Sequence, residues 1–329
     1  MSNKTIIVTG GAGYIGSHVC LQLQAVGYQP VVVDNFCTGN RFVIDRLKLP
    51  LYEGDISDPK FINRVFKKYN PTAVMHFAAH TQVGESVCDP SKYYLNNVQA
   101  TLNLLNCMVT NEIKKIIFSS TAAVYGMPIS VPIKEEDSLK PINPYGWSKF
   151  MIEQILRDFD EAYEMRAVVF RYFNAAGADH KAGIGELHNP ETHLIPLTIK
   201  SCLEGKPIKV FGKDYSTPDG TCIRDYVHVS DIARAHIFGL EALMLDSYGG
   251  TYNIGNGDGY SVLEVVGAVE SVIGKKIKIE YVERRPGDPP KLVASADRIK
   301  TELGWAPEFP VLKDIVESAY NWQKSLNAL

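Results

Sequence analysis

The residues of this 329-residue chain best suited to proton transfer are Tyr145 and Lys149, which stand four positions apart. Residues with this spacing share one face of a helix, and Ile152, Ile155 and Leu156 predict an amphipathic helix here. An ammonium group beside a phenol lowers the pKa of the tyrosine from about 10, which favours the phenolate as a general base. The spacing is common, however, and also fits a plain contact between an aromatic and an aliphatic side chain.

Three hydroxyl residues, Ser119, Ser120 and Thr121, stand at the end of an apolar segment that predicts a strand. A hydroxyl at this place could orient a substrate alcohol and share its proton with Tyr145. A polar strand end without any chemical role explains the segment equally well when it is taken alone.

A glycine-rich turn follows the first predicted strand, Thr5–Val8, and contains Gly10, Gly13 and Gly16. Residues without a Cβ let a pyrophosphate approach the backbone N–H groups at the start of the next helix. Because a strand precedes the turn and a helix follows it, the pattern indicates a dinucleotide site and not merely a tight turn.

Asp34 ends the second predicted strand, Gln29–Val33, and lies 21 residues after Gly13. An acid about 20 residues after the turn accepts hydrogen bonds from the adenosine ribose and repels the 2′-phosphate of NADP, so NAD is favoured. Arg41 lies beyond Asp34 in a polar loop and does not change this expectation.

These residues require a scaffold in which strands and helices alternate. Further strands are predicted at 51–53, 73–77, 115–120 and 167–172, and helices at 58–69 and 89–109, each beginning with Asp-Pro. The alternation predicts a doubly wound parallel sheet, the Rossmann arrangement of the α/β class, over residues 1–176. Residues 177–329, with a capping box at Ser261–Glu264, are expected to form a smaller mixed α/β lobe. Some of these later segments are expected to return to the first domain.

The composition narrows the range of partners. A formal net charge of −3 provides no general attraction for nucleic acid or an anionic membrane, and no apolar run is long enough to span a bilayer. The six cysteines lack pairing or metal-ligand spacing, which favours a reducing cytoplasm. His76, His80, His193 and His228 have no metal-like spacing either, so no metal is expected.

The chain resembles the extended short-chain dehydrogenase/reductase family, and within it the UDP-hexose 4-epimerases, almost from end to end. The motifs that carry the resemblance are TGGAGYIGSH at 9–18, GDI at 54–56, HFAA at 76–79, VGES at 83–86, SSTAAVYG at 119–126, RYFN at 171–174, DGT at 219–221, RDYVHV at 224–229 and RPGD at 285–288.

The resemblance assigns a role to individual residues. It implies that Tyr145, Lys149 and Thr121 are catalytic. The implied NAD site consists of Gly10, Gly13, Tyr14, Ile15, Gly16, Asp34, Asn35, Asp55, Ile56, Phe77, Ala78, Asn96, Ser119, Tyr145, Lys149 and Tyr172. The implied UDP-sugar site consists of Thr121, Tyr145, Asn174, Leu194, Phe211, Arg224, Tyr226, Arg285, Asp288 and Leu292. Two arginines in the second set suit a pyrophosphate, because their planar groups bind it in a bidentate manner.

The implied reaction is the reversible 4-epimerisation of UDP-glucose and UDP-galactose through a 4-keto sugar, with tightly bound NAD. Removal of the proton at C4 directly is not feasible, because the hexose has no carbonyl next to that carbon. The resemblance also implies a homodimer, formed through helices such as 89–109 and 145–163.

Three other functions remain open. A nucleotide-sugar 4,6-dehydratase needs an Asp-Glu pair after the strand-end threonine, where this chain has Ala122 and Ala123. An epimerase or decarboxylase of UDP-uronic acids needs a cationic cluster for the carboxylate, and none is evident beyond the pyrophosphate arginines. A non-enzymatic NAD-sensing module would have no need for Tyr145, Lys149 and Thr121 together.

Three positions depart from the family pattern. Thr81 stands where some members have a lysine near the cofactor, and His193 replaces an asparagine. Leu292 falls where members of narrow specificity have a tyrosine against the sugar. Leucine is smaller, so N-acetylated UDP-hexoses are expected to be accepted as well.

Overall fold

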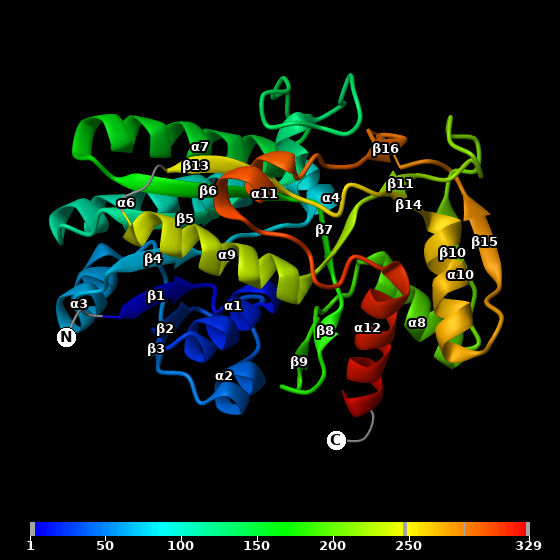
Figure 1. The fold of residues 1–329 in the computed structure, drawn as a ribbon, viewed down its shortest axis with the longest axis horizontal. Coiled ribbons are helices and arrows are strands. Elements are labelled where there is room, and N and C mark those ends of the chain that lie inside the picture. The colour runs from blue at the N-terminus through cyan, green and yellow to red at the C-terminus, as the bar shows by residue number, and fades with distance from the viewer. Residues whose placement is uncertain (1–3, 246–248, 286, 327–329) are drawn as a thin grey trace.

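The computed structural model, which describes residues 4–245, 249–285 and 287–326, has a parallel sheet of seven strands at the centre of its larger lobe (Figure 1). Across the sheet the strand order is β13-β6-β5-β4-β1-β2-β3. The strands are β1 (Thr5–Thr9), β2 (Gln29–Asp34), β3 (Leu51–Glu53), β4 (Ala73–His76), β5 (Lys115–Ser119), β6 (Arg166–Tyr172) and β13 (Gly250–Ile254). The predicted doubly wound Rossmann sheet is therefore confirmed.

Helices cover both faces of this sheet, because successive side chains of a strand point to opposite sides. On β1, Ile6 and Val8 pack into one apolar cluster, and Ile7 packs into another. The helices over the first face are α1 (Tyr14–Ala25), α2 (Arg41–Leu47), α9 (Val229–Met244) and α11 (Asp297–Leu303). Those over the second face are α3 (Pro59–Tyr69), α6 (Ala100–Thr110) and α7 (Pro144–Tyr163).

The predicted helix over 89–109 is interrupted, and this expectation is corrected. The segment consists of α5 (Pro90–Tyr93), a π-helix over Tyr94–Gln99 and then α6. A π turn accommodates one extra residue per turn and often lies at a functional site. Here it contains the buried Asn97, whose amide nitrogen donates to the His80 carbonyl oxygen at 3.0 Å and to Ser148 Oγ at 3.0 Å. These bonds link the loop after β4 to α7.

Polar side chains cap the N-termini of several helices, as the sequence predicts. Asp58 accepts from the Lys60 amide at 2.9 Å at the start of α3, and Asp89 accepts from the Lys92 amide at 3.2 Å at the start of α5. Ser261 and Glu264 form the predicted capping box of α10 (Val262–Ile273). Two shorter helical segments complete this part: α4 (Val83–Cys88) and a 3₁₀ turn over Ala122–Tyr125.

The second lobe combines three helices with small sheets, as expected for a mixed α/β unit (Figure 1). Helices α8 (Leu194–Glu204), α10 (Val262–Ile273) and α12 (Leu312–Leu326) share one apolar cluster. The paired strands are β10 (Ile208–Phe211) with β15 (Ile279–Val282), β11 (Ile223–Arg224) with β14 (Tyr260–Ser261) and β16 (Lys291–Leu292), β12 (Tyr226–His228) with β7 (Asn174–Ala176), and β8 (Ala178–Asp179) with β9 (Ile184–Gly185).

Within the described ranges, no helix has the length and apolar character needed to cross a bilayer. All six cysteines are unpaired, and Cys37 and Cys88 are exposed.

Candidate active site

The glycine turn lies between β1 and α1, with Gly13 at the N-cap of the helix. Gly10 has a positive φ of 72°, and a Cβ at this position would lie 2.5 Å from the Ala78 amide nitrogen. A Cβ on Gly16 would collide with the carbonyl oxygen of Gly10. The turn is thus packed against the residues that follow β4, and its close backbone approach fits a pyrophosphate at the start of α1.

Asp34 lies directly beside this turn, as its spacing predicts. The Ala12 amide donates to Asp34 Oδ2 at 3.0 Å, and the Phe36 amide donates to Oδ1 at 2.8 Å. Burial raises the pKa of Asp34, although the two amide bonds act in the opposite direction. The carboxylate is therefore fixed in place at the end of β2, next to the start of α1.

Near the expected adenine site, Asn35 and Asp55 form a hydrogen-bonded polar pair, and the apolar Ile56 follows them in the chain. Asn35 Nδ2 donates to Asp55 Oδ2 at 2.8 Å, and the Ser57 amide donates to Asp55 Oδ1 at 2.8 Å. Burial raises the pKa of Asp55, but these hydrogen bonds outweigh it and hold the pKa below its ordinary value. Ile56, which follows Asp55, is buried in the apolar core.

Tyr145 occupies the first turn of α7, which Asn143 caps by accepting from the Gly146 amide at 2.8 Å. The Tyr145 hydroxyl is hydrogen-bonded to the side chain of Thr121. Burial raises the pKa of Tyr145, and the bond to Thr121 works against this rise. The predicted base and the predicted strand-end hydroxyl are therefore in contact.

Lys149 is buried one turn further along α7, and its Nζ donates to the carbonyl oxygen of Ser119 at 2.8 Å. Burial lowers the pKa of Lys149 to about 7, and the charge of Glu153 acts in the opposite direction. The Ser119 hydroxyl is in turn bonded to the Tyr172 hydroxyl. Lys149, Ser119 and Tyr172, which the sequence places on three separate elements, thus form one connected group.

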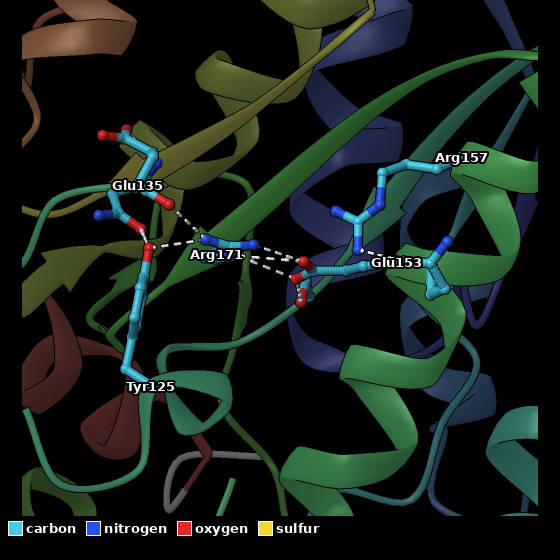
Figure 2. A network of polar contacts seen from close by, with 8 residues as sticks. Tyr125, Glu135, Glu153, Arg157 and Arg171 are labelled. Carbon is cyan, nitrogen blue, oxygen red and sulfur yellow. Dashed lines mark hydrogen bonds and ion pairs between the residues drawn. The ribbon is translucent and has the colours of Figure 1, made fainter. Parts of the chain in front are cut away.

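A buried ion pair that the sequence analysis missed supports this group (Figure 2). The guanidinium of Arg171, on β6, binds both carboxylate oxygens of Glu153, with Nη2 at 2.6 Å from Oε2. Ser120 Oγ donates to Glu153 Oε1 at 2.5 Å, and Arg171 Nη1 donates to the Tyr125 hydroxyl at 2.9 Å. The signal in the sequence was a glutamate on the apolar side of a helix opposite an arginine in an apolar strand.

Two of the polar side chains that were expected to hold a UDP group, Arg224 and Asp288, form an ion pair. Arg224, on β11, binds Asp288 through Nη2 and the carbonyl oxygen of Ile223 through Nη1 at 2.8 Å. Leu292, on β16, is the register partner of Arg224 in the parallel pair β11–β16. Polar and apolar candidates for the sugar site therefore lie on adjacent strands.

The two residues expected around the uracil and the phosphates are stacked. The guanidinium of Arg285 lies 4.0 Å from the centre of the Phe211 ring.

The other candidates for the sugar site lie on three elements. Tyr226 is the register partner of Asn174 in the parallel pair β7–β12, and Leu194 is the first residue of α8. Residue 286, in the RPGD motif, lies outside the described residues.

The remaining candidates lie near these groups or at the surface. Phe77 and Ala78 follow β4 next to the glycine turn, and Asn96 donates to the side chain of Asn97 at 2.9 Å. Of the positions that depart from the family pattern, Thr81 is exposed, and His193 contacts Glu186 in the segment before α8.

Residues 6–255 match the NAD dependent epimerase/dehydratase family. The chain is 48% identical over 328 residues to the UDP-glucose 4-epimerase of Rhizobium leguminosarum bv. trifolii, with 99% of each covered. It is similar to the crystal structure of UDP-glucose 4-epimerase from Bifidobacterium longum in complex with NAD+ and UDP, at a TM-score of 0.92 and 41% identity over 98% of both chains. It is also similar to the UDP-Glc/GlcNAc 4-epimerase of Campylobacter jejuni, at a TM-score of 0.85 and 39% identity over 98% of this chain and 99% of the other.

Proposed function

This chain belongs to the NAD dependent epimerase/dehydratase family, and we propose how its own residues carry out 4-epimerisation. With NAD as cofactor, it catalyses the reversible interconversion of UDP-glucose and UDP-galactose through a 4-keto sugar. The observation that carries the assignment of catalytic residues is the contact between the Tyr145 hydroxyl and the Thr121 side chain. It joins the first turn of α7 to the strand end of β5.

The glycine turn and its surroundings fit NAD. A Cβ at Gly10 or Gly16 would collide with neighbouring backbone atoms, so only glycine fits at these positions. Asp34 stands where a ribose would meet the turn. We assign the adenine end to Asp55 and Ile56, and the remaining contacts to Gly13, Tyr14, Ile15, Asn35, Phe77, Ala78, Asn96, Ser119, Tyr145, Lys149 and Tyr172. When bound, NAD supplies reversible acceptance of a hydride at its nicotinamide ring.

We assign the role of general base to Tyr145. Its oxygen takes the proton of the sugar's 4-hydroxyl and later returns it, while Thr121 orients that hydroxyl. Because burial raises the pKa of Tyr145, the phenolate needs a positive charge nearby. Protonated Lys149, one turn away on the same helix face, supplies that charge.

The second lobe would hold the UDP group. Arg224 and Arg285 offer planar, always-charged groups for the pyrophosphate, and Asp288 offers a carboxylate for ribose hydroxyls. Phe211 provides a face on which uracil can stack. The 4-keto sugar must present both faces of C4 in turn, so the sugar rotates while UDP stays bound. We assign Asn174, Leu194, Tyr226 and Leu292 to the walls of the sugar pocket.

The substrate range is proposed to include N-acetylated UDP-hexoses. Leu292 is half-buried and packs at the edge of an apolar cluster with Phe150 and Phe173. A leucine leaves more space beside the sugar than a tyrosine and presents no hydroxyl there. The similar protein from Campylobacter jejuni is a UDP-Glc/GlcNAc 4-epimerase, which supports this extension.

We propose that two copies associate through the helices on the α7 side of the molecule. Large apolar side chains are exposed there: Leu95 at 58%, Leu102 at 37%, Trp147 at 39% and Met151 at 40%. They come from the π-helix, α6 and α7, which contact one another. Sedimentation velocity should give a dimer, and Leu95→Glu together with Met151→Glu should give a monomer.

We also propose a domain division and a compartment. Residues 1–176 form the NAD-binding domain, to which α9 and β13 return by packing on α1 and pairing with β6. The rest of 177–329 forms the UDP-sugar lobe. Because exposed Cys37 and Cys88 remain free thiols, we place the enzyme in the reducing cytoplasm.

The function is tested by incubating the NAD-loaded protein with UDP-galactose and measuring UDP-glucose. Wild type should approach the same equilibrium mixture from either sugar. Tyr145→Phe should lower kcat by about 10²–10⁴-fold while UDP still binds, because only the proton acceptor is lost. Near-normal turnover by Tyr145→Phe would contradict the assignment of the base.

A further inference from the structure

Four side chains of the segment between β9 and α8 converge on one point: Glu186, His188, Glu191 and His193. One ligand atom from each lies within 4.8 Å of the other three. We propose that this 186–193 cluster binds one divalent first-row transition metal ion, with Zn²⁺ as the best match. The proposal is independent of the catalytic assignments, because none of the catalytic residues belongs to the cluster.

The ligand atoms of the cluster already lie close to one another. His188 Nδ1 lies 2.9 Å from Glu186 Oε1, and His193 Nδ1 contacts the same oxygen. His188 Nδ1 also lies 3.9 Å from Glu191 Oε1. Zn²⁺ binds nitrogen at about 2.0–2.1 Å and oxygen at about 2.0–2.2 Å, which separates neighbouring ligands of a tetrahedron by roughly 3.4 Å. Small side-chain rotations would therefore seat the ion between the four groups.

Charge gives the second argument. The Glu186 side chain is 5% exposed and that of Glu191 is 18% exposed. A carboxylate this buried needs a cationic partner. In the part of the chain that the structure describes, the ion-pair partners of Glu186 are His188 and His193, and no lysine or arginine pairs with it. Two carboxylates and two neutral imidazoles around a divalent ion would be electrically neutral.

Neighbouring groups hold the ligands in place, as is usual around metal sites. The amides of Thr192 and His193 donate to Glu191 Oε1 at 2.7 Å and 2.8 Å. Trp322 Nε1 donates to the carbonyl oxygen of Glu186 at 2.9 Å, which ties the segment to α12. The ring of Tyr14 meets that of His188 edge to face, with 6.2 Å between centroids.

The ligand set indicates the class of metal and its role. Two imidazole nitrogens and two carboxylate oxygens suit Zn²⁺ and related ions better than Mg²⁺ or Ca²⁺, which prefer oxygen alone. Four protein ligands fill a tetrahedron and leave no open position, which is typical of a structural site. The ion would stabilise the 186–193 segment, which contacts Tyr14 at the glycine turn and leads into Leu194 at the start of α8.

The expectation of no metal rests on the spacing of the histidines alone. That spacing does not reveal the cluster, because the partners of His193 are His188, five residues earlier, and two glutamates. The pattern Glu-x-His-x-x-Glu-x-His over 186–193 contains all four ligands.

The test uses the full-length, NAD-loaded protein after treatment with a chelator. Co²⁺ is added as a spectroscopic probe, and Zn²⁺ affinity is measured by competition with a coloured chelator. We expect one equivalent of ion per chain, the visible absorption of tetrahedral Co²⁺, and a raised midpoint of thermal unfolding with Zn²⁺. His188→Ala and Glu191→Gln should each weaken binding at least 100-fold. His180→Ala, which removes an exposed histidine between β8 and β9, should bind as wild type does.

Two results would overturn the proposal. One is wild-type protein that binds less than half an equivalent of Zn²⁺ at micromolar concentration. The other is binding in His188→Ala and Glu191→Gln that matches wild type, which would place the ion elsewhere. The wild-type titration decides the matter even if either variant fails to fold.

Discussion

Lys149 and Glu153 lie on successive turns of α7, and both are almost fully buried, at 2% and 1% exposure. The carboxylate of Glu153 is neutralised by the guanidinium of Arg171, and the ammonium of Lys149 donates to the Ser119 carbonyl oxygen. The two charges are thus supported very differently: Glu153 is paired directly with a guanidinium, whereas the hydrogen-bond partner of Lys149 is a neutral carbonyl group. Two predictions follow from this difference, one for each residue.

Replacing Lys149 by methionine should stabilise the nucleotide-free fold at neutral pH while it abolishes turnover. Burial lowers the pKa of Lys149 to about 7 in the folded chain, and the unfolded value is about 10.4. Between these values the unfolded state binds more protons, so wild-type stability rises with pH through this window and is lowest below about pH 7. Lys149→Met should therefore exceed wild type by a few kcal/mol below pH 7, and by less as the pH approaches 10.

Urea unfolding at pH 6.5, 8 and 9.5 measures this difference. Lys313→Met is the matched control, because Lys313 is exposed on α12 and its replacement should leave the pH dependence unchanged. A difference between Lys149→Met and wild type that stays constant across the three pH values would contradict the depressed pKa.

Replacing Glu153 by glutamine should destabilise the fold, because it leaves the charge of Arg171 buried without its partner. The expected loss is about 3–5 kcal/mol in the free energy of unfolding. Glu153 also raises the pKa of Lys149, so its removal should move the alkaline limb of the kcat–pH profile to lower pH. Arg157→Gln, one turn further along α7 and exposed, should change stability by less than about 0.5 kcal/mol (Figure 2). Equal stability of the two variants would rule out the proposed role of the ion pair.

The sequence allowed much of this arrangement to be predicted, because the deciding patterns are local. Glycine spacing and Asp34 indicate the dinucleotide turn, and a pair at i and i+4 places Tyr145 and Lys149 on one helix face. Glu153 and Arg171 lie 18 positions apart on a helix and a strand, and no periodicity connects them. Asn97 escaped prediction since a π turn changes the face on which a residue lies, and propensity does not reveal that change.

Replacing Arg224 by lysine should weaken the binding of UDP-hexoses more than it slows the chemical step. A lysine keeps the charge but cannot bind a phosphate in a bidentate manner or keep the present geometry with Asp288. We expect KM for UDP-galactose to rise about 10–100-fold, equivalent to 1.4–2.8 kcal/mol, with kcat changed less than fivefold. Arg284→Lys is the control, because Arg284 is exposed and pairs with Asp214 at the surface. A fall in kcat at unchanged KM would show that Arg224 does not serve binding.

Replacing Leu292 by tyrosine should narrow the substrate range. Leu292 stands beside Arg224 in the β11–β16 pair, so a larger side chain there reduces the space next to the hexose while the UDP contacts remain. Wild type should convert both UDP-galactose and UDP-N-acetylglucosamine. Leu292→Tyr should retain activity on UDP-galactose and lose at least tenfold in kcat/KM for UDP-N-acetylglucosamine. The reason is that the tyrosine ring would occupy the volume that the acetamido group needs. Leu292→Met, which preserves side-chain volume, should behave as wild type does. Product analysis by chromatography of both nucleotide sugars measures the ratio. If wild type converts UDP-galactose and leaves UDP-N-acetylglucosamine unchanged, Leu292 does not set the specificity.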